Sequence, residues 1–207
     1  MKEEIYDKLL SIVTAGFGEW LYQTIHYNRY EATPYEALDL FFQEYQLDKK
    51  DKLVDFGCGR GRVAFYIHHR FQIPVTGVEA IEETYEQAVQ NRTAYLENHP
   101  HIGAPIRFLY GPAEDYKVEP ADNRFYFFNP FSIHIFRKVV SNILDSIREK
   151  ERSTDMILYY PMPEYELYLK RSTPFQLIKE VRLPDTNDNF DKFLVYRYDQ
   201  HNGKLRI

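Results

Sequence analysis

Short apolar runs alternate with longer amphipathic stretches from about Asp51 to the end of the chain. Runs rich in Val, Ile, Phe and Tyr predict strands, and stretches whose apolar residues recur every three or four positions predict helices. The predicted strands are Leu53–Phe56, Val75–Val78, Ile106–Tyr110, Phe125–Phe128, Met156–Tyr160, Phe175–Leu183 and Lys192–Tyr198. The helices predicted between them are Gly61–Phe71, Ile81–Asn98, Ile133–Lys150 and Pro163–Arg171.

The order of these elements predicts the fold class. Strand and helix alternate until the last two strands, which follow one another. Alternation is typical of βαβ units with right-handed crossovers, and therefore of a mostly parallel sheet. The last two strands are joined by a segment rich in Asp and Asn, Pro184 to Asp191, and predict an antiparallel hairpin on that sheet. We therefore expect an α/β fold.

The first 50 residues have a different pattern, with predicted helices at Glu3–Thr14 and Pro34–Leu47. Thr33 before Pro34 suggests a helix start, with the hydroxyl as N-cap and proline at the first helical position. A segment of this length rarely buries a core of its own. We therefore expect a helical extension, residues 1–50, packed on a domain formed by residues 51–207.

Composition narrows the possible partners and compartment. The net charge is −5, and the extension holds five basic and nine acidic residues, so a long phosphate-backbone footprint is disfavoured, although a local basic patch leaves RNA open. Cys58 is the single cysteine, which excludes an intramolecular disulfide and a cysteine-based zinc site and favours the cytoplasm. Neither a signal peptide nor a membrane-spanning apolar run is expected. Oligomeric state stays open.

A glycine-rich segment directly follows the first strand, with the sequence Asp55-Phe56-Gly57-Cys58-Gly59-Arg60-Gly61. Glycines let the backbone turn tightly there and bring helix-start amides close to a ligand. Glu79 ends the second strand, 22 residues after Gly57, where a carboxylate can accept two hydrogen bonds from a ribose diol. Because Arg62 stands where a dinucleotide motif has its third glycine, a nicotinamide-dependent oxidoreductase is the weaker alternative.

At these residues the sequence resembles the class I S-adenosylmethionine-dependent methyltransferases, whose first motif has the form acidic-x-Gly-x-Gly-x-Gly. The resemblance runs from about Leu53 to Tyr198 and implies a seven-stranded Rossmann-like sheet with S-adenosylmethionine as the cofactor. It implies that Asp55 and the backbone of the three glycines, Gly57, Gly59 and Gly61, hold the methionine part. It further implies that Glu79 binds the ribose and that Ala80 and Ile81 pack on the adenine ring. It also implies that Ala113 and Glu114 contact the adenine amine, with Asp115 as a further candidate.

Asn129-Pro130-Phe131 follows the fourth predicted strand and resembles the Asn-Pro-Pro-aromatic motif of amino-group methyltransferases, with one proline missing. The resemblance implies that Asn129 orients the acceptor and that Phe131 helps to exclude water. It predicts methyl transfer by in-line displacement, slightly favouring an amine nitrogen, to a small molecule or protein rather than RNA. The alternative is a non-catalytic S-adenosylmethionine-binding or interaction protein.

The extension also has an implied role. In similar methyltransferases the stretch before the first motif covers the cofactor, so the resemblance implies a lid in which Tyr30 and Tyr35 place hydroxyls near the cofactor's carboxylate. No metal site is expected, because His68 and His69 lie on different faces of a helix and no His-Glu-x-x-His occurs.

Overall fold

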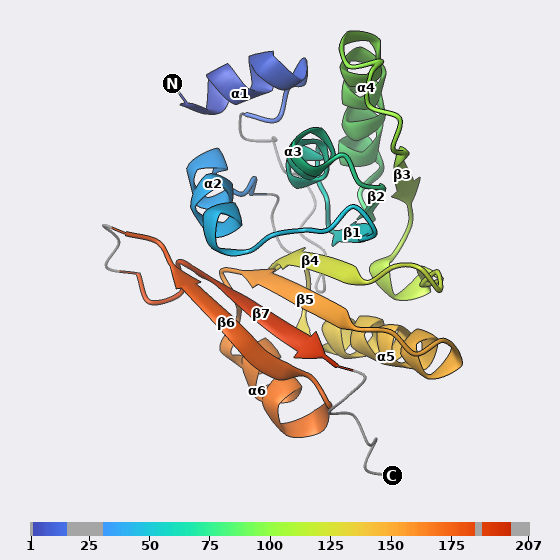
Figure 1. Ribbon diagram of the computed structural model, residues 1–207, viewed down its shortest axis with the longest axis vertical. Coiled ribbons are helices and arrows are strands. Elements are labelled where there is room, and N and C mark those ends of the chain that lie inside the picture. The colour runs from blue at the N-terminus through green and yellow to red at the C-terminus, as the bar shows by residue number, and fades with distance from the viewer. Residues whose placement is uncertain (1, 16–30, 185–187, 200–207) are drawn as a thin grey trace.

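The computed structural model describes residues 2–15, 31–184 and 188–199, and within these ranges one seven-stranded sheet forms the centre of the molecule (Figure 1). The strand order is β3-β2-β1-β4-β5-β7-β6. The strands are β1 Leu53–Phe56, β2 Val75–Glu79, β3 Ile106–Tyr110, β4 Arg124–Phe128, β5 Thr154–Tyr159, β6 Gln176–Arg182 and β7 Lys192–Tyr198. Strands β1 to β5 pair in parallel, whereas β7 is antiparallel to both β5 and β6. The predicted α/β fold with an antiparallel C-terminal hairpin is confirmed.

Helices cover both faces of the sheet. They are α1 Lys2–Leu10, α2 Tyr35–Glu44, α3 Arg62–Phe71, α4 Glu82–Asn98, α5 Ile133–Glu149 and α6 Pro163–Ser172, with a short 3₁₀ helix, η1, at Ala113–Asp115. The first four lie on one side of the sheet, and α5 and α6 lie on the other (Figure 1). Side chains alternate between the two faces along a strand. Leu53 therefore joins the core under α1 to α4, and Val54 joins the core under α5 and α6.

The two helices before β1 are shorter than their apolar pattern predicts. Helix α1 ends at Leu10 because Ser11 adopts a left-handed conformation, with φ of 56°, and the next amide bonds back to Asp7 O. The predicted N-cap at Thr33 is wrong. Pro34 precedes the first helical residue and makes no side-chain cap, while the Thr33 hydroxyl lies 2.8 Å from the hydroxyl of Tyr126 on β4. The Thr33 hydroxyl therefore bonds to the sheet, not to the start of its own helix.

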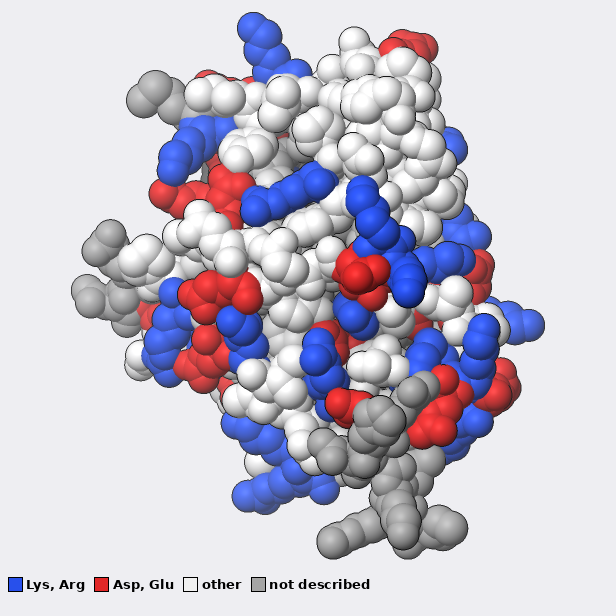
Figure 2. Space-filling view, in the orientation of Figure 1, with Lys and Arg blue, Asp and Glu red and all other residues white. Residues whose placement is uncertain are grey.

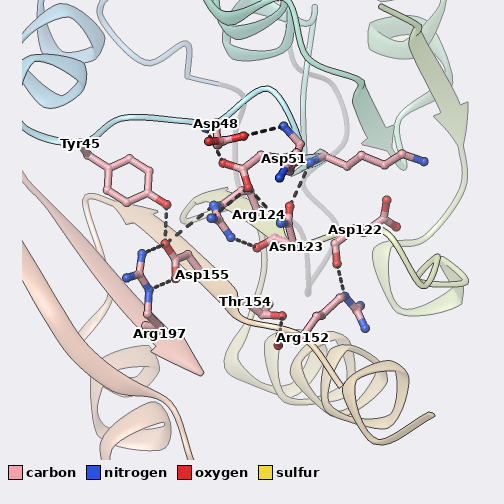
Figure 3. Close-up of polar contacts among 12 residues, drawn as sticks. Tyr45, Asp48, Asp51, Asp122, Asn123, Arg124, Arg152, Thr154, Asp155 and Arg197 are labelled. Carbon is pink, nitrogen blue, oxygen red and sulfur yellow. Dashed lines mark hydrogen bonds and ion pairs between the residues drawn. The ribbon is translucent and has the colours of Figure 1, made fainter. Parts of the chain in front are cut away.

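A buried polar network lies at the amino ends of the central strands (Figure 3). Asp155 on β5 is fully buried and accepts two hydrogen bonds of 2.7 Å from the Arg197 guanidinium and one of 2.5 Å from the Tyr45 hydroxyl. Arg124 on β4 lies 3.8 Å from the same carboxylate and 2.9 Å from Asp51. Because Tyr45 directly follows α2, this network ties that helix to β4, β5 and β7.

The described helices are short or polar relative to the apolar core of a lipid bilayer. None of them combines the length and the apolarity that a membrane crossing requires.

Candidate functional site

The glycine-rich segment forms a tight loop between β1 and α3. Gly57 and Gly59 have φ angles of 71° and 55°, in the region that favours glycine. The amides of Gly57 and Cys58 both donate to Val78 O, at 2.9 and 3.1 Å, and so hold the loop against the end of β2. A Cβ on Gly57 would lie 2.4 Å from Cβ of Pro130, which follows β4. The loop, β2 and β4 therefore meet closely at one edge of the sheet, and only glycine fits between them.

Glu79 ends β2 directly beside this loop. One carboxylate oxygen accepts the Gly59 amide at 2.8 Å, and the other accepts the Ile81 amide at 2.9 Å. Burial raises the pKa of Glu79, and these two amides together with that of Ala80 oppose the rise. Each carboxylate oxygen has two lone pairs, so acceptor capacity remains for hydroxyl groups of a ligand. The carboxylate is therefore positioned by the backbone around it.

Asp55, near the end of β1, has an incompletely paired carboxylate. The side chain is 3% exposed, and within the described part of the chain its Oδ2 has no hydrogen-bond partner. Burial, and then the negative charge of Glu79, raise the pKa of Asp55 to about 8, while the Ala64 amide opposes the rise. A buried carboxylate oxygen without a partner is costly. The position is thus suited to a ligand group that is positively charged and donates hydrogen bonds.

The segment after β3 lies next to the end of β2, because the Gly111 amide donates to Glu79 O at 2.9 Å. Ala113 is buried in η1, and Asp115 is exposed. The Glu114 carboxylate lies 3.9 Å from Lys138 Nζ. Ala80 and Ile81, which follow Glu79, are partly buried. The structure thus brings the residues predicted for ribose and adenine to one edge of the sheet.

The segment after β4 combines a turn at that edge with a core residue. Asn129 has a φ of 39°, a left-handed conformation that asparagine tolerates better than most residues. Phe131 is 1% exposed and packs edge-on against Phe127, and its carbonyl accepts a hydrogen bond from Tyr165 of α6. The expectation that the Phe131 ring shields an acceptor from water is therefore corrected: the ring fills the core under α5 and α6.

The two tyrosines predicted for the cofactor's carboxylate have different outcomes. Tyr30 lies outside the described residues. Tyr35 is fully buried, donates its hydroxyl to Asp7 at 2.7 Å and stacks on Tyr6 with ring centroids 4.5 Å apart. Its hydroxyl hydrogen is engaged within the extension, so we assign Tyr35 to the packing of α1 on α2 instead.

A cavity of about 390 Å³ lies where the extension meets the ends of β4 and β5. Its walls include Phe128, Tyr159, Tyr160 and Asp191 from the sheet side, and Glu31 and Arg62 from the other. No role in the site was predicted for these four sheet-side residues, because they carry no motif of their own. Tyr160 has a φ of 48°. A non-glycine residue in this conformation costs about 1 to 3 kcal/mol, and such strain is often found at functional sites.

Arg62 contributes to the opposite wall as a paired residue. It is 5% exposed, its Nε donates to the Thr14 hydroxyl at 2.7 Å, and it forms an ion pair with Glu3. Its guanidinium also lies 4.6 Å from the centroid of the Tyr35 ring. The role of Arg62 in the described structure is thus to hold α1 against the start of α3.

Comparison with known proteins gives structural but not sequence matches: no family model and no curated protein matches the sequence. An RNA methyltransferase from Salinibacter ruber, in complex with S-adenosyl-L-homocysteine, matches with a TM-score of 0.56 and 15% identity over 81% of this chain and 92% of that chain. A putative RNA methyltransferase from Pyrococcus horikoshii matches with a TM-score of 0.53 and 15% identity over 95% of each chain.

A third similar structure has a different acceptor. It is the geranyl diphosphate C-methyltransferase from Streptomyces coelicolor A3(2), in complex with Mg²⁺, geranyl diphosphate and S-adenosyl-L-homocysteine, with a TM-score of 0.52 and 15% identity over 79% of this chain and 77% of that chain. Together with the strand order, these matches show that the chain has the fold of the class I S-adenosylmethionine-dependent methyltransferases.

Proposed function

We propose that this protein is an S-adenosylmethionine-dependent methyltransferase. The observation that carries the proposal is the buried Oδ2 of Asp55 beside the glycine loop, which has no hydrogen-bond partner among the described residues. The α-amino group of a methionine moiety is largely protonated near neutral pH and donates hydrogen bonds, so it fits this position. Glu79, which retains acceptor capacity at the end of β2, fits the two hydroxyls of a ribose.

In this proposal the chain's own residues bind and orient. Asp55 and the amides of the glycine loop hold the methionine part, Glu79 holds the ribose, and Ala80, Ile81, Ala113 and Glu114 surround the adenine. When bound, the cofactor supplies an electrophilic methyl group on a positively charged sulfur. Asn129, at the edge where the loop meets β4, orients the acceptor, since direct displacement requires reacting atoms about 3 Å apart and in line.

For the acceptor we favour an amine nitrogen on a small molecule or a protein. The cavity lined by Phe128, the residue before Asn129, has a volume of about 390 Å³, which lies within the roughly 300 to 1,000 Å³ typical of small-molecule sites. Basic and acidic side chains are interspersed over the face shown in Figure 2. A surface that binds a nucleic-acid backbone over a long footprint is instead predominantly basic.

Binding and transfer can be tested separately. In calorimetry we expect S-adenosylhomocysteine and S-adenosylmethionine to bind and reduced nicotinamide dinucleotide not to bind; the reverse result would overturn the proposal. A transfer screen with labelled cofactor should then use cell fractions divided into metabolites, proteins and RNA. Label in the metabolite or protein fraction supports the proposed acceptor. Binding without transfer to any fraction would instead identify a non-catalytic binding protein.

We further propose that residues 1–50 act as a lid over this site. Thr14, Ala15, Ala32 and Pro34 of the extension line the same cavity as the ends of β4 and β5, which supports the idea. A ligand that binds the closed state stabilises it. We expect limited proteolysis near Tyr30 to be slower with S-adenosylhomocysteine than without it. Equal cleavage rates would leave the extension as a fixed part of the scaffold.

A further inference from the structure

Three aromatic rings in the cavity meet at steep angles. Phe128 ends β4, Tyr159 ends β5 beside it in register, and Tyr160 is the next residue. The ring centroids of Phe128 and Tyr159 are 4.7 Å apart at 55°, those of Phe128 and Tyr160 are 6.4 Å apart at 65°, and those of Tyr159 and Tyr160 are 6.3 Å apart at 67°. All three residues line the cavity. The rings therefore border one space from different directions instead of forming a flat stack.

Two carboxylates accept hydrogen bonds from the hydroxyls of the two tyrosines. The Tyr159 hydroxyl donates to Asp191 at 2.7 Å, and the Tyr160 hydroxyl donates to Asp188 at 2.5 Å. Burial and the bond to Asp191 raise the pKa of Tyr159, and the bond to Asp188 raises the pKa of Tyr160, so both phenols stay neutral. The same bond lowers the pKa of Asp188, which is therefore ionised near neutral pH. We call these five residues, Phe128, Tyr159, Tyr160, Asp188 and Asp191, the aromatic-acidic cage.

The charges around the cage have an excess of negative sign. Glu31 lines the cavity and is near enough to act electrostatically on both tyrosines. Arg62, in the opposite wall, is ion-paired with Glu3, and Lys192 beside Asp191 is 3.5 Å from Glu166. Within the described ranges Asp191 itself forms no ion pair. The cavity is thus lined by aromatic rings and by the carboxylates of Glu31 and Asp191, while Arg62 and Lys192 already have anionic partners.

We propose that the aromatic-acidic cage binds an organic ammonium group of a small-molecule acceptor. Aromatic faces attract cations through their quadrupole, most strongly where water is excluded, and arrangements of several rings recognise quaternary and methylated ammonium groups. Phe128 directly precedes Asn129, and Arg62 directly follows Gly61, so the cavity that the cage lines adjoins both the β4 turn and the glycine loop. The role of the bound molecule as a methyl acceptor rests on the proposed methyltransferase function, whereas the binding of an ammonium group does not.

The first test uses ligands that differ only in charge. Choline and its neutral isostere, in which a tert-butyl group replaces trimethylammonium, are titrated into the full-length protein saturated with S-adenosylhomocysteine. We expect choline to bind at least about 10-fold more tightly than the isostere. Equal affinities, or tighter binding of acetate than of choline, would overturn the proposal. A peptide containing trimethyllysine that binds while choline does not would overturn the small-molecule assignment.

The second test uses matched variants. Tyr160→Leu, which removes a ring, should weaken choline binding at least about 10-fold, whereas Tyr160→Phe, which keeps the ring, should stay within about 3-fold of wild type. Asp191→Asn should weaken it more than Asp145→Asn, which removes the same charge from the exposed, Arg148-paired position on α5. Equal effects of the two charge variants would reduce the cage to general electrostatic attraction and contradict the proposal.

Two further measurements distinguish loss of ligand binding from misfolding, and failure of the cage from failure of the proposed function. Melting temperatures confirm that each variant is folded, and S-adenosylhomocysteine affinity should be unchanged in all four. If the wild type prefers choline to its isostere but does not bind S-adenosylhomocysteine, the proposed function fails and the cage stands. If it binds S-adenosylhomocysteine without preferring choline, the cage fails and the proposed function stands.

Discussion

Asp55 on β1 and Asp155 on β5 are both almost completely buried, with 3% and 0% of their surfaces exposed. Both side chains face α1 to α4, because each lies two positions from a residue of that core, Leu53 and Ile157 respectively. Asp155, at the amino end of its strand, is bonded to Arg197 and Tyr45 and lies near Arg124. Asp55, near the carboxyl end of its strand, has one oxygen without a partner in the part of the chain that the structure describes.

The difference separates a structural carboxylate from one available to a ligand. Removing a charged group from water costs roughly several kcal/mol unless opposite charges and hydrogen bonds offset the cost. The fold itself supplies those partners to Asp155, whereas the charge that acts on Asp55 is that of Glu79, which has the same sign. Ligands of open α/β sheets bind outside the carboxyl ends of the strands. The unpaired carboxylate is thus found at the end of the sheet where a ligand could pair with it.

The same substitution at both positions tests the two assignments most strongly. Asp155→Asn should lower the free energy of unfolding by about 3 kcal/mol, the lower end of the range for a buried ion pair, because it leaves two partly buried arginines, Arg124 and Arg197, short of an anionic partner. Asp55→Asn should not lower it at pH 8. Urea unfolding measures both values. A loss at Asp155 no greater than that at Asp55 would contradict the assignment of the network as structural.

The pH dependence of stability should also distinguish Asp55 from a paired carboxylate. The pKa of Asp55 rises from its ordinary 3.8 to about 8 on folding, so its favourable contribution is complete below about pH 4 and is lost as the pH rises to 8. The stability of Asp55→Asn relative to wild type should therefore increase over this range, by at most about 1.4 kcal/mol per pH unit and in total by roughly 2 to 3 kcal/mol once the site relaxes. Urea unfolding between pH 5 and pH 9 measures the trend, and a constant difference would contradict it.

Substitution of Glu79 tests whether the carboxyl ends of the strands bind the cofactor. Glu79→Ala should weaken S-adenosylhomocysteine binding by about 10- to 150-fold, which corresponds to the roughly 1.5 to 3 kcal/mol of a charge-assisted hydrogen bond. Glu82→Ala, at an exposed position in the first turn of α4, removes the same charge nearby and should have little effect. Calorimetry measures both affinities. Unchanged binding in Glu79→Ala would remove its ribose role.

Asn129 gives the smallest expected effect and separates binding from turnover. Asn129→Ala should lower the transfer rate by about 10- to 100-fold through loss of acceptor orientation, while S-adenosylhomocysteine affinity stays near that of wild type. Transfer of labelled methyl groups and calorimetry measure the two quantities. An equal loss of cofactor affinity would instead assign Asn129 to the cofactor site or to the fold.

The strands, most helix bounds and the glycine loop could be predicted from the sequence alone. These features depend on short-range patterns: side-chain alternation in strands, helical periodicity, and the need for glycine where φ is positive. The sequence also placed Asp55 and Glu79 at one edge, because the carboxyl ends of parallel strands meet there. These predictions held because neighbouring residues along the chain, and the βαβ order, contain the information.

Contacts between side chains far apart in the sequence could be identified only from the tertiary structure. The Thr33 hydroxyl bonds to Tyr126, 93 positions away, instead of capping its helix, and the Tyr45 hydroxyl bonds to Asp155, 110 positions away. The burial of Phe131 and the three rings of the cage likewise depend on how separate elements pack. No local pattern encodes such contacts, because a side chain's partner is set by the long-range packing that creates its surroundings.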